Sequence, residues 1–166
     1  MRIKITADST CDLNKDLLTA NDITLTPLIV IKNDEEFYDG ETITPADIFE
    51  HVAAGGSLCS TAARSVGYYQ EVFEKFSSEY DGVVHISIGS GFSSCHQNAR
   101  LATEEMDNVY VVDSCNLSTG FGHVVMAAGD RIAAGMPVEQ IVEEVQALSQ
   151  KVEASFIVDN LEFLHK

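Results

Sequence analysis

A run of glycines and serines is the stretch of this sequence best suited to holding a ligand. Residues 89–94 read Gly-Ser-Gly-Phe-Ser-Ser, after an apolar stretch at 83–88 and before residues at helical spacing. The glycines let a ligand approach the backbone, and hydroxyls and free N–H groups at a helix start offer neutral donors to an anion. Ser60 and Thr61, from a loop at 57–61, can add hydroxyls. Because residues 89–94 include neither Lys nor Arg, we expect a single carboxylate or one phosphate rather than a polyphosphate.

Acidic residues follow three of the apolar stretches, at the strand ends where α/β sheets bind ligands. The three segments are Asp8-Ser9-Thr10, Asp113-Ser114 and Asp159-Asn160. Asp, Ser and Asn are typical of helix N-caps and turns, which gives these residues a structural interpretation. The alternative is that Asp8 or Asp113 acts as a nucleophile or magnesium ligand, in a magnesium-dependent phosphatase or phosphotransfer domain.

Other sequence motifs of catalysis are absent. Neither the phosphate-loop pattern G-x-x-x-x-G-K-[ST] nor the nucleophile elbow G-x-S-x-G occurs. The histidines and the four cysteines are scattered without metal-ligand spacing, and the cysteines are expected to be reduced. Ser93 and His96 lie on one helix, a poor geometry for a nucleophile and its base. We therefore expect no metal site and no cofactor-binding motif, while the phosphatase or phosphotransfer alternative stays open.

Apolar periodicity divides the chain into alternating strands and helices. The predicted strands lie near residues 3–7, 23–31, 83–88, 109–112 and 156–158. The predicted helices lie near residues 14–20, 44–55, 66–76, 92–106, 117–134 and 138–148. Pro27 favours an edge position or a bend in the second strand, and turn residues at 32–41 favour a hairpin.

This alternation indicates an α/β fold, a three-layer α/β/α domain with a mostly parallel sheet. The strands near 83, 109 and 156 are nearly continuous apolar runs, as expected when helices cover both faces of a sheet. A length of 166 residues fits one domain.

The charge of the chain excludes several partners. Ten Lys and Arg against 26 Asp and Glu give a net charge of −16, which would repel nucleic acid and anionic membranes. The sequence has no apolar run of membrane-spanning length and no pattern of a secretory signal, so we expect no stable membrane insertion and a cytoplasmic location.

Several motifs together resemble those of the DegV family. Residues 6–13, TADSTCDL, are similar to its opening motif, and residues 86–94, ISIGSGFSS, resemble its serine-rich loop, usually close to SISSGLSGTY. Val112-Asp113-Ser114 with Ser118, Gly120 and Gly122, Thr26-Pro27-Leu28 and Tyr38-Asp39-Gly40 also fit the family. The likeness runs in order along essentially the whole chain.

The resemblance implies a bacterial fatty-acid-binding protein, a carrier rather than an enzyme, that holds a long-chain fatty acid by its carboxylate. Some members present the acyl chain to a separate catalytic subunit of fatty acid kinase. By position, Ser93 matches the family's loop serine and Thr61 matches its upstream Ser or Thr. The upstream motif of the family is usually close to TSQPS, whereas residues 60–64 here read Ser-Thr-Ala-Ala-Arg. The ligand-contacting residues predicted from spacing and resemblance are Ser93, Thr61, Ser60, Ser90, Gly91, Ser94, Ser114 and Thr10.

Family members are much longer than this sequence. Residues 160–166 resemble the crossing into a second domain that helps to enclose the acyl chain. We therefore expect residues 1–166 to form the family's N-terminal α/β domain without the second domain. An apolar face left uncovered in this way would favour a homodimer.

Overall fold

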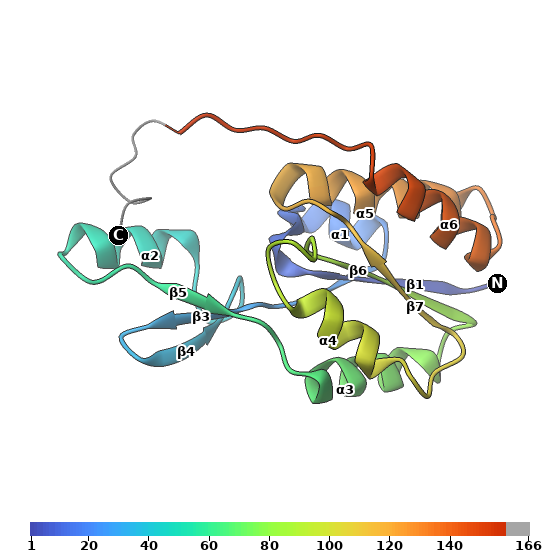
Figure 1. Cartoon of the computed structure of the whole chain (residues 1–166), viewed down its shortest axis with the longest axis horizontal. Helices are drawn as coiled ribbons and strands as arrows, with labels where there is room; N and C mark the ends of the chain where they lie inside the picture. Colours follow the sequence, from blue (N-terminus) through green and yellow to red (C-terminus); the bar gives the residue numbers. More distant parts are fainter. Residues whose placement is uncertain (159–166) are drawn as a thin grey trace.

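The structure is a computed structural model that describes residues 1–158, and its centre is a four-stranded parallel sheet in the order β2-β1-β6-β7 (Figure 1). The strands are β1 (Ile3–Asp8), β2 (Ile23–Thr26), β6 (Gly82–Ser87) and β7 (Val109–Asp113). All three pairings are parallel, and every residue of the central strand β6 is buried. Full burial explains why β6 reads as an apolar run rather than an alternating one.

Helices cover both faces of this sheet (Figure 1). One layer contains α1 (Lys15–Ala20), α5 (Ser118–Ala133) and α6 (Val138–Ser149). The other contains α3 (Val66–Ser77) and α4 (Cys95–Ala102). A short 3₁₀ turn, η1 (Ser9–Cys11), follows β1. The predicted three-layer α/β/α fold with a parallel sheet is thus confirmed.

The core lies between the sheet and the two layers. Helix α3 contributes Tyr69 and Phe73, and α5 contributes Phe121, each with 0% of its surface exposed. These residues recur at helical spacing, so each amphipathic helix buries one face against the strands. The sheet supplies the opposite wall from apolar β1, β6 and β7 residues.

A second, smaller sheet stands apart from the central one. Pro27 follows β2, which is an edge strand, and the chain then leaves the central sheet. The departing segment forms β3 (Ile29–Lys32), β4 (Glu35–Tyr38), α2 (Pro45–Ala53) and β5 (Ser60–Ala62). Its strands form an antiparallel sheet in the order β4-β3-β5. We call residues 28–63 the lobe and the remaining described residues the body.

Local sequence signals place many of the turns and helix ends. Asn33 and Asp34 adopt positive φ angles of 54° and 64° in the hairpin between β3 and β4, a conformation that Asn and Asp tolerate. Thr44 and Asp47 form a capping box at the start of α2. Gly55, with a φ of 88°, follows the end of α2. The predicted hairpin and the predicted start of this helix are confirmed.

Three predictions of local structure are wrong. Residues 156–158 form no strand; Phe156 is 80% exposed and Ile157 fully exposed, because no described strand lies beside them to pair with. Helix α4 is shorter than the predicted 92–106, because residues 89–94 form a loop. The predicted loop at 57–61 runs into β5. Asp159 and Asn160, the third strand-end pair, lie outside the described residues.

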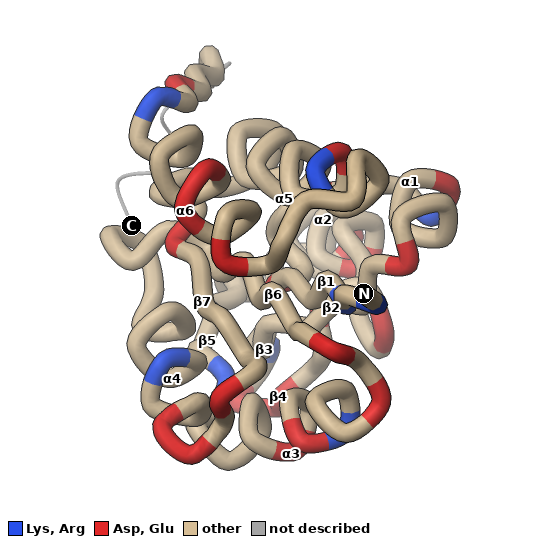
Figure 2. Tube along the Cα trace, turned by 90° about the vertical axis from the view of Figure 1, so that its right-hand side faces the viewer, with Lys and Arg blue, Asp and Glu red and all other residues tan. Residues whose placement is uncertain are grey.

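Acidic side chains spread over both helical layers, whereas Lys and Arg are few and scattered (Figure 2). Among the described residues, none of the helices combines the length and the apolar character needed to cross a bilayer.

Helix α5 depends on a glycine for its close approach to η1. A Cβ atom built on Gly122 would lie 2.5 Å from the Cys11 carbonyl oxygen, whereas one on Gly67 of α3 would have no neighbour within 4 Å. We expect Gly122→Ala to lower the free energy of unfolding by about 1–3 kcal/mol, because backbone must shift. Gly67→Ala is the matched control and should raise that free energy by up to about 1 kcal/mol. Urea unfolding measures both; a Gly122→Ala variant as stable as the parent would contradict the packing described.

Candidate carboxylate-binding site

A hollow of about 260 Å³ lies where the lobe meets the body. Its lining residues are Leu28, Thr61, Ala62, Ala63, Ile88, Phe92, Ser93 and Ser94. The fold therefore brings Thr61 of the lobe to the same hollow as Ser93 and Ser94 of the body. The remaining lining side chains are apolar and the lining includes no charged residue, so the hollow joins hydroxyls to an apolar wall.

Strand alternation separates Thr61 from Ser60. In β5, Thr61 pairs with Val30 and Ser60 pairs with Ile31, and neighbouring residues of a strand point to opposite faces. Ser60 accordingly lines a different hollow, with Ile31 and Asn33 among its neighbours. The prediction that both residues of this pair face one ligand does not fit the register of β5.

We call residues 89–94, the part of the serine-rich segment that follows Ile88, the serine-rich loop, and it is held in place by contacts with Asp113 at the end of β7 and with Asn116 beyond it. A Cβ atom on Gly89 would lie 2.8 Å from the Asn116 backbone nitrogen, so only glycine fits there. The Gly89 N–H donates to the Asn116 carbonyl at 2.8 Å, and the Ser90 N–H donates to Asp113 Oδ1 at 3.0 Å. Ser90 and Gly91 are exposed and do not line the hollow. The Ser90 N–H ties the loop to Asp113.

Ser93 combines two hydrogen-bonding roles at the start of α4. Its Oγ accepts the Cys95 N–H at 3.2 Å, which satisfies one of the free donors of the helix. The hydroxyl proton of Ser93 stays available, because a hydroxyl donates one hydrogen bond as well as accepting. Ser94 is exposed and lines the same hollow as Ser93. His96 does not pair with Ser93; its Nδ1 lies 2.9 Å from Ser87 Oγ.

Two other predicted residues lie away from the hollow. Ser114 is fully buried. Its hydroxyl donates a hydrogen bond to the Asn116 carbonyl and accepts one from the Asn116 N–H, so it bonds within its own loop both as a donor and as an acceptor. The Thr10 hydroxyl is buried with no hydrogen-bond partner among the described residues, and Thr10 is not among the residues that line the hollow.

Asp113 has the turn role that its sequence context indicates. Its Oδ1 accepts the N–H groups of Ser90 and Cys115, at 3.0 and 2.8 Å. Burial would raise the pKa of Asp113, but these hydrogen bonds outweigh burial and hold the pKa below its usual value. The ionised carboxylate thus ties the end of β7 to the serine-rich loop.

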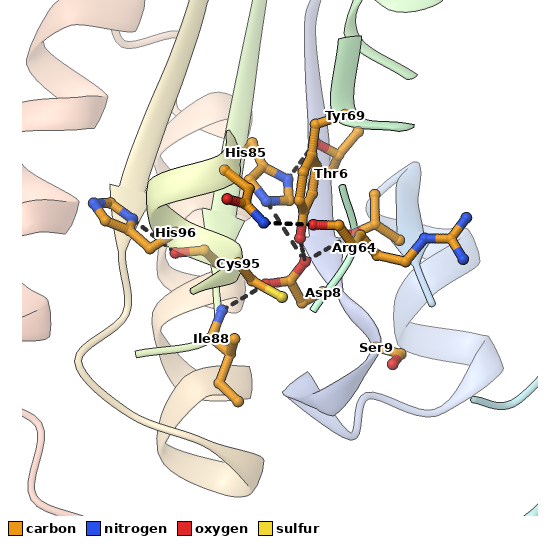
Figure 3. Close-up of polar contacts among 12 residues, drawn as sticks. Thr6, Asp8, Ser9, Arg64, Tyr69, His85, Ile88, Cys95 and His96 are labelled. Atoms are coloured by element: carbon orange, nitrogen blue, oxygen red, sulfur yellow. Dashed lines mark hydrogen bonds and ion pairs between the residues drawn. The ribbon is translucent and has the colours of Figure 1, made fainter. Parts of the chain in front are cut away.

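Asp8 is a buried acceptor rather than the helix cap expected from the sequence. Its carboxylate makes no cap bond to η1. Its Oδ1 accepts the Thr26 hydroxyl at 2.8 Å and the Tyr69 hydroxyl at 2.7 Å, and its Oδ2 accepts the Ile88 N–H at 2.8 Å (Figure 3). Asp8 therefore joins the ends of β1 and β2, helix α3 and the residue that precedes the serine-rich loop.

Two buried side chains, His85 and Tyr69, lie beside this carboxylate, and the sequence pattern indicates for them only a place in the core or, for His85, on the surface. His85 Nδ1 lies 3.0 Å from the Thr6 hydroxyl, and His85 Nε2 lies 3.7 Å from Asp8 Oδ1 (Figure 3). Burial lowers the pKa of His85 to about 4 although Asp8 opposes that shift, so His85 is neutral at pH 7. Burial, reinforced by Asp8, raises the pKa of Tyr69, which keeps its hydroxyl a donor.

This geometry does not favour the magnesium alternative. Asp8 has 0% of its surface exposed, and both carboxylate oxygens accept hydrogen bonds from the protein. Asp113 binds two backbone N–H groups. Within residues 1–158, no group of three or more His, Cys, Asp or Glu side chains is arranged to hold a metal ion.

Comparisons with known proteins point to one family. The DegV family profile matches residues 2–166. A DegV domain-containing protein of Clostridium acetobutylicum is 29% identical over 99% of this chain, which spans 59% of that relative's length. Two solved structures have the same fold. One, described as the fatty acid binding of a DegV family protein from Thermus thermophilus, gives a TM-score of 0.83 at 32% identity; the match covers 90% of this chain and 54% of that one. The other, a stearic acid-binding protein from Eubacterium ventriosum, has a TM-score of 0.78 at 27% identity. That match covers 87% of this chain and 52% of the other chain.

The three hydrogen bonds to Asp8 predict a large loss of stability in an isosteric variant. Asp8→Asn removes the charge and turns an amide NH₂ towards at least one donor, so we expect the free energy of unfolding to fall by about 2–4 kcal/mol. Asp12→Asn is the matched control, because exposed Asp12 adopts a φ of 53° that Asn tolerates; it should change stability by less than about 0.5 kcal/mol. Urea unfolding at pH 7 compares the two, and equal stability would argue against the role given to Asp8.

Neutral His85 predicts a loss of stability in acid. Its pKa is about 4 in the folded protein against 6.5 as an ordinary value, so between these pH values the unfolded chain binds a proton that the folded chain does not. Stability should therefore fall as the pH drops from 6.5 to 4, by up to about 3 kcal/mol from this residue. His85→Asn should flatten the pH dependence in that window, whereas His123→Asn, on the exposed side of α5, should keep it. The measurement is urea unfolding at several pH values; identical slopes in His85→Asn and the parent would contradict the assignment.

Proposed function

Because this chain belongs to the DegV family, we propose that it binds a long-chain fatty acid through the carboxylate. The observation that carries the proposal is the hollow in which the hydroxyls of Thr61 and Ser93 lie beside Leu28, Ile88 and Phe92. A carboxylate accepts hydrogen bonds from hydroxyls, and the start of α4 adds the positive end of a helix dipole. The apolar residues then contact the first part of the acyl chain.

The remainder of the acyl chain requires a second space. Ligand pockets are typically about 300–1,000 Å³, so the hollow of about 260 Å³ suits the carboxylate end. A neighbouring hollow of about 430 Å³ shares Phe92 as a wall and includes Leu117 and Phe156 in its lining. In our proposal the acyl chain passes Phe92 into this space. The two solved relatives from Thermus thermophilus and Eubacterium ventriosum support a lipid ligand, since they are described as binding a fatty acid and stearic acid.

We further propose that the protein is a carrier rather than an enzyme. The lining of the carboxylate hollow has hydroxyls and apolar groups but no acid, base or cation that could activate a phosphoryl donor. A separate catalytic subunit of fatty acid kinase is the partner that the family resemblance suggests. A cytoplasmic location and a homodimer, each first expected from the sequence, stay predictions. The exposed side chains of Phe92, Phe156 and Ile157 support the homodimer.

Titration of the delipidated chain with stearic acid tests the proposed contacts. Thr61→Ala and Ser93→Ala each remove a hydrogen bond to a charged group, so each should weaken binding by about tenfold or more. Ser60→Ala is the matched control, since Ser60 is the neighbour of Thr61 on the other face of β5, and it should bind like the parent.

A second Ser93 variant separates the proposed ligand role of Ser93 from its hydrogen bond to the Cys95 N–H. Ser93→Asp keeps an acceptor for the Cys95 N–H but brings a negative charge towards the ligand carboxylate. We expect its unfolding free energy to stay close to that of the parent while stearic acid binding is lost. Parent-like affinity in both Ser93→Asp and Thr61→Ala would refute the proposed site.

A further inference from the structure

The lobe and the body meet through few contacts. The chain passes between them at 27–28 and at 63–64, and within the described residues the helices and strands of the two parts pack sparsely against each other. Thr61 belongs to the lobe and Ser93 to the body, and both line the hollow at the junction. The spacing of the two hydroxyls therefore depends on whatever holds the lobe in place.

Arg64 contacts an aromatic ring on each side of this junction. Its guanidinium carbon lies 3.5 Å from the ring centroid of Tyr68, on helix α3 of the body. The same carbon lies 4.8 Å from the ring centroid of Tyr38, the last residue of β4 in the lobe. Both distances are within the range of a cation–π interaction. A single cation thus bridges the two parts.

The surroundings of Arg64 favour stacking over ion pairing. The ion pairs among residues 1–158 are Lys4–Asp22 and Arg131–Glu144, neither of which includes Arg64. The Arg64 Nε is buried and makes no hydrogen bond within the described chain. Its carbonyl accepts the Asn98 side-chain N–H at 2.7 Å, which fixes the backbone at the crossing. Although the chain has an excess of acidic residues, Arg64 stacks on two aromatic rings and forms no ion pair with a described acid. We therefore assign Arg64 a role in packing the lobe against the body.

Polar contacts connect the lobe and the body at the other crossing, at residues 27–28. Ser9, the residue after Asp8, donates from Oγ to Asp39 Oδ2 at 2.5 Å and accepts the Leu28 N–H at 3.1 Å. The Asp39 N–H in turn donates to the Leu28 carbonyl at 3.0 Å. These bonds attach the lobe to the body at the first crossing, and the Arg64 contacts lie at the second crossing.

We propose that Arg64 is a positioning residue that holds the lobe against the body by stacking between Tyr38 and Tyr68. We call these three residues the Arg64 clamp. With the clamp closed, Thr61 stays opposite Ser93 across the hollow. The effect on ligand affinity rests on the proposed function, whereas the clamp itself is a property of the ligand-free protein.

Hydrogen exchange of the ligand-free chain tests the clamp without a ligand. In Arg64→Ala we expect the Leu28 and Asp39 amides to exchange at least about fivefold faster, while amides of β6 keep their protection. Arg64→Lys, which keeps a cation, should show a smaller increase. Lys32→Ala is the matched control. Like Arg64→Ala, this variant loses one positive charge and one cation–π contact, but the lost contact, 4.8 Å from Lys32 Nζ to the Phe37 ring centroid, lies within the lobe. Parent-like exchange at Leu28 in Arg64→Ala, or equally faster exchange in β6, would overturn the proposal.

Stearic acid titration then tests the consequence for binding. Arg64→Ala and Tyr38→Leu should each weaken binding by about two- to fivefold, and the double variant should bind no more weakly than Arg64→Ala alone. Lys32→Ala should bind like the parent. If Thr61→Ala and Ser93→Ala weaken binding while Arg64→Ala matches Lys32→Ala, the positioning role fails. If Thr61→Ala and Ser93→Ala leave binding unchanged, the proposed function fails, and the exchange result still decides the clamp.

Discussion

The buried carboxylate of Asp8 is the group around which the site is built. An ionised carboxylate without partners would be strongly destabilising in a protein interior, so its burial requires donors from several directions. Thr26, Tyr69 and the Ile88 N–H meet that requirement from β2, α3 and the end of β6. Since Ile88 directly precedes the serine-rich loop, the same bond that satisfies the carboxylate also fixes where that loop begins. The body side of the hollow is therefore set by the core, whereas the lobe side depends on contacts at two chain crossings.

Much of the fold could be predicted because local physics agrees with the tertiary structure. The buried run of β6, the bend at Pro27 and the capping box at Thr44 each carry a signal that the surrounding chain does not override. The glycine and serine content of residues 89–94 likewise indicated a loop open to a ligand. The structure then brings Thr61 of β5 and Ser93 of the loop before α4 to one hollow.

Other features depend on contacts that spacing does not encode. Asp8 has the residue type of a helix cap, and only the fold shows that its neighbours are donors from three other elements. Ser60 and Thr61 are indistinguishable until the register of β5 assigns each a face. Ser114 has a hydroxyl at a strand end, but Asn116 uses it within the loop. The apolar residues 156–158 predict burial, although a strand also needs a neighbour with which to pair.

The proposed function depends on one property of this chain, the binding of a fatty acid by its carboxylate. The most direct measurement is mass spectrometry of lipid extracted from freshly purified protein, compared with a mock purification. We expect a long-chain fatty acid in near-stoichiometric amount. An extract that matches the mock purification would contradict the proposed function.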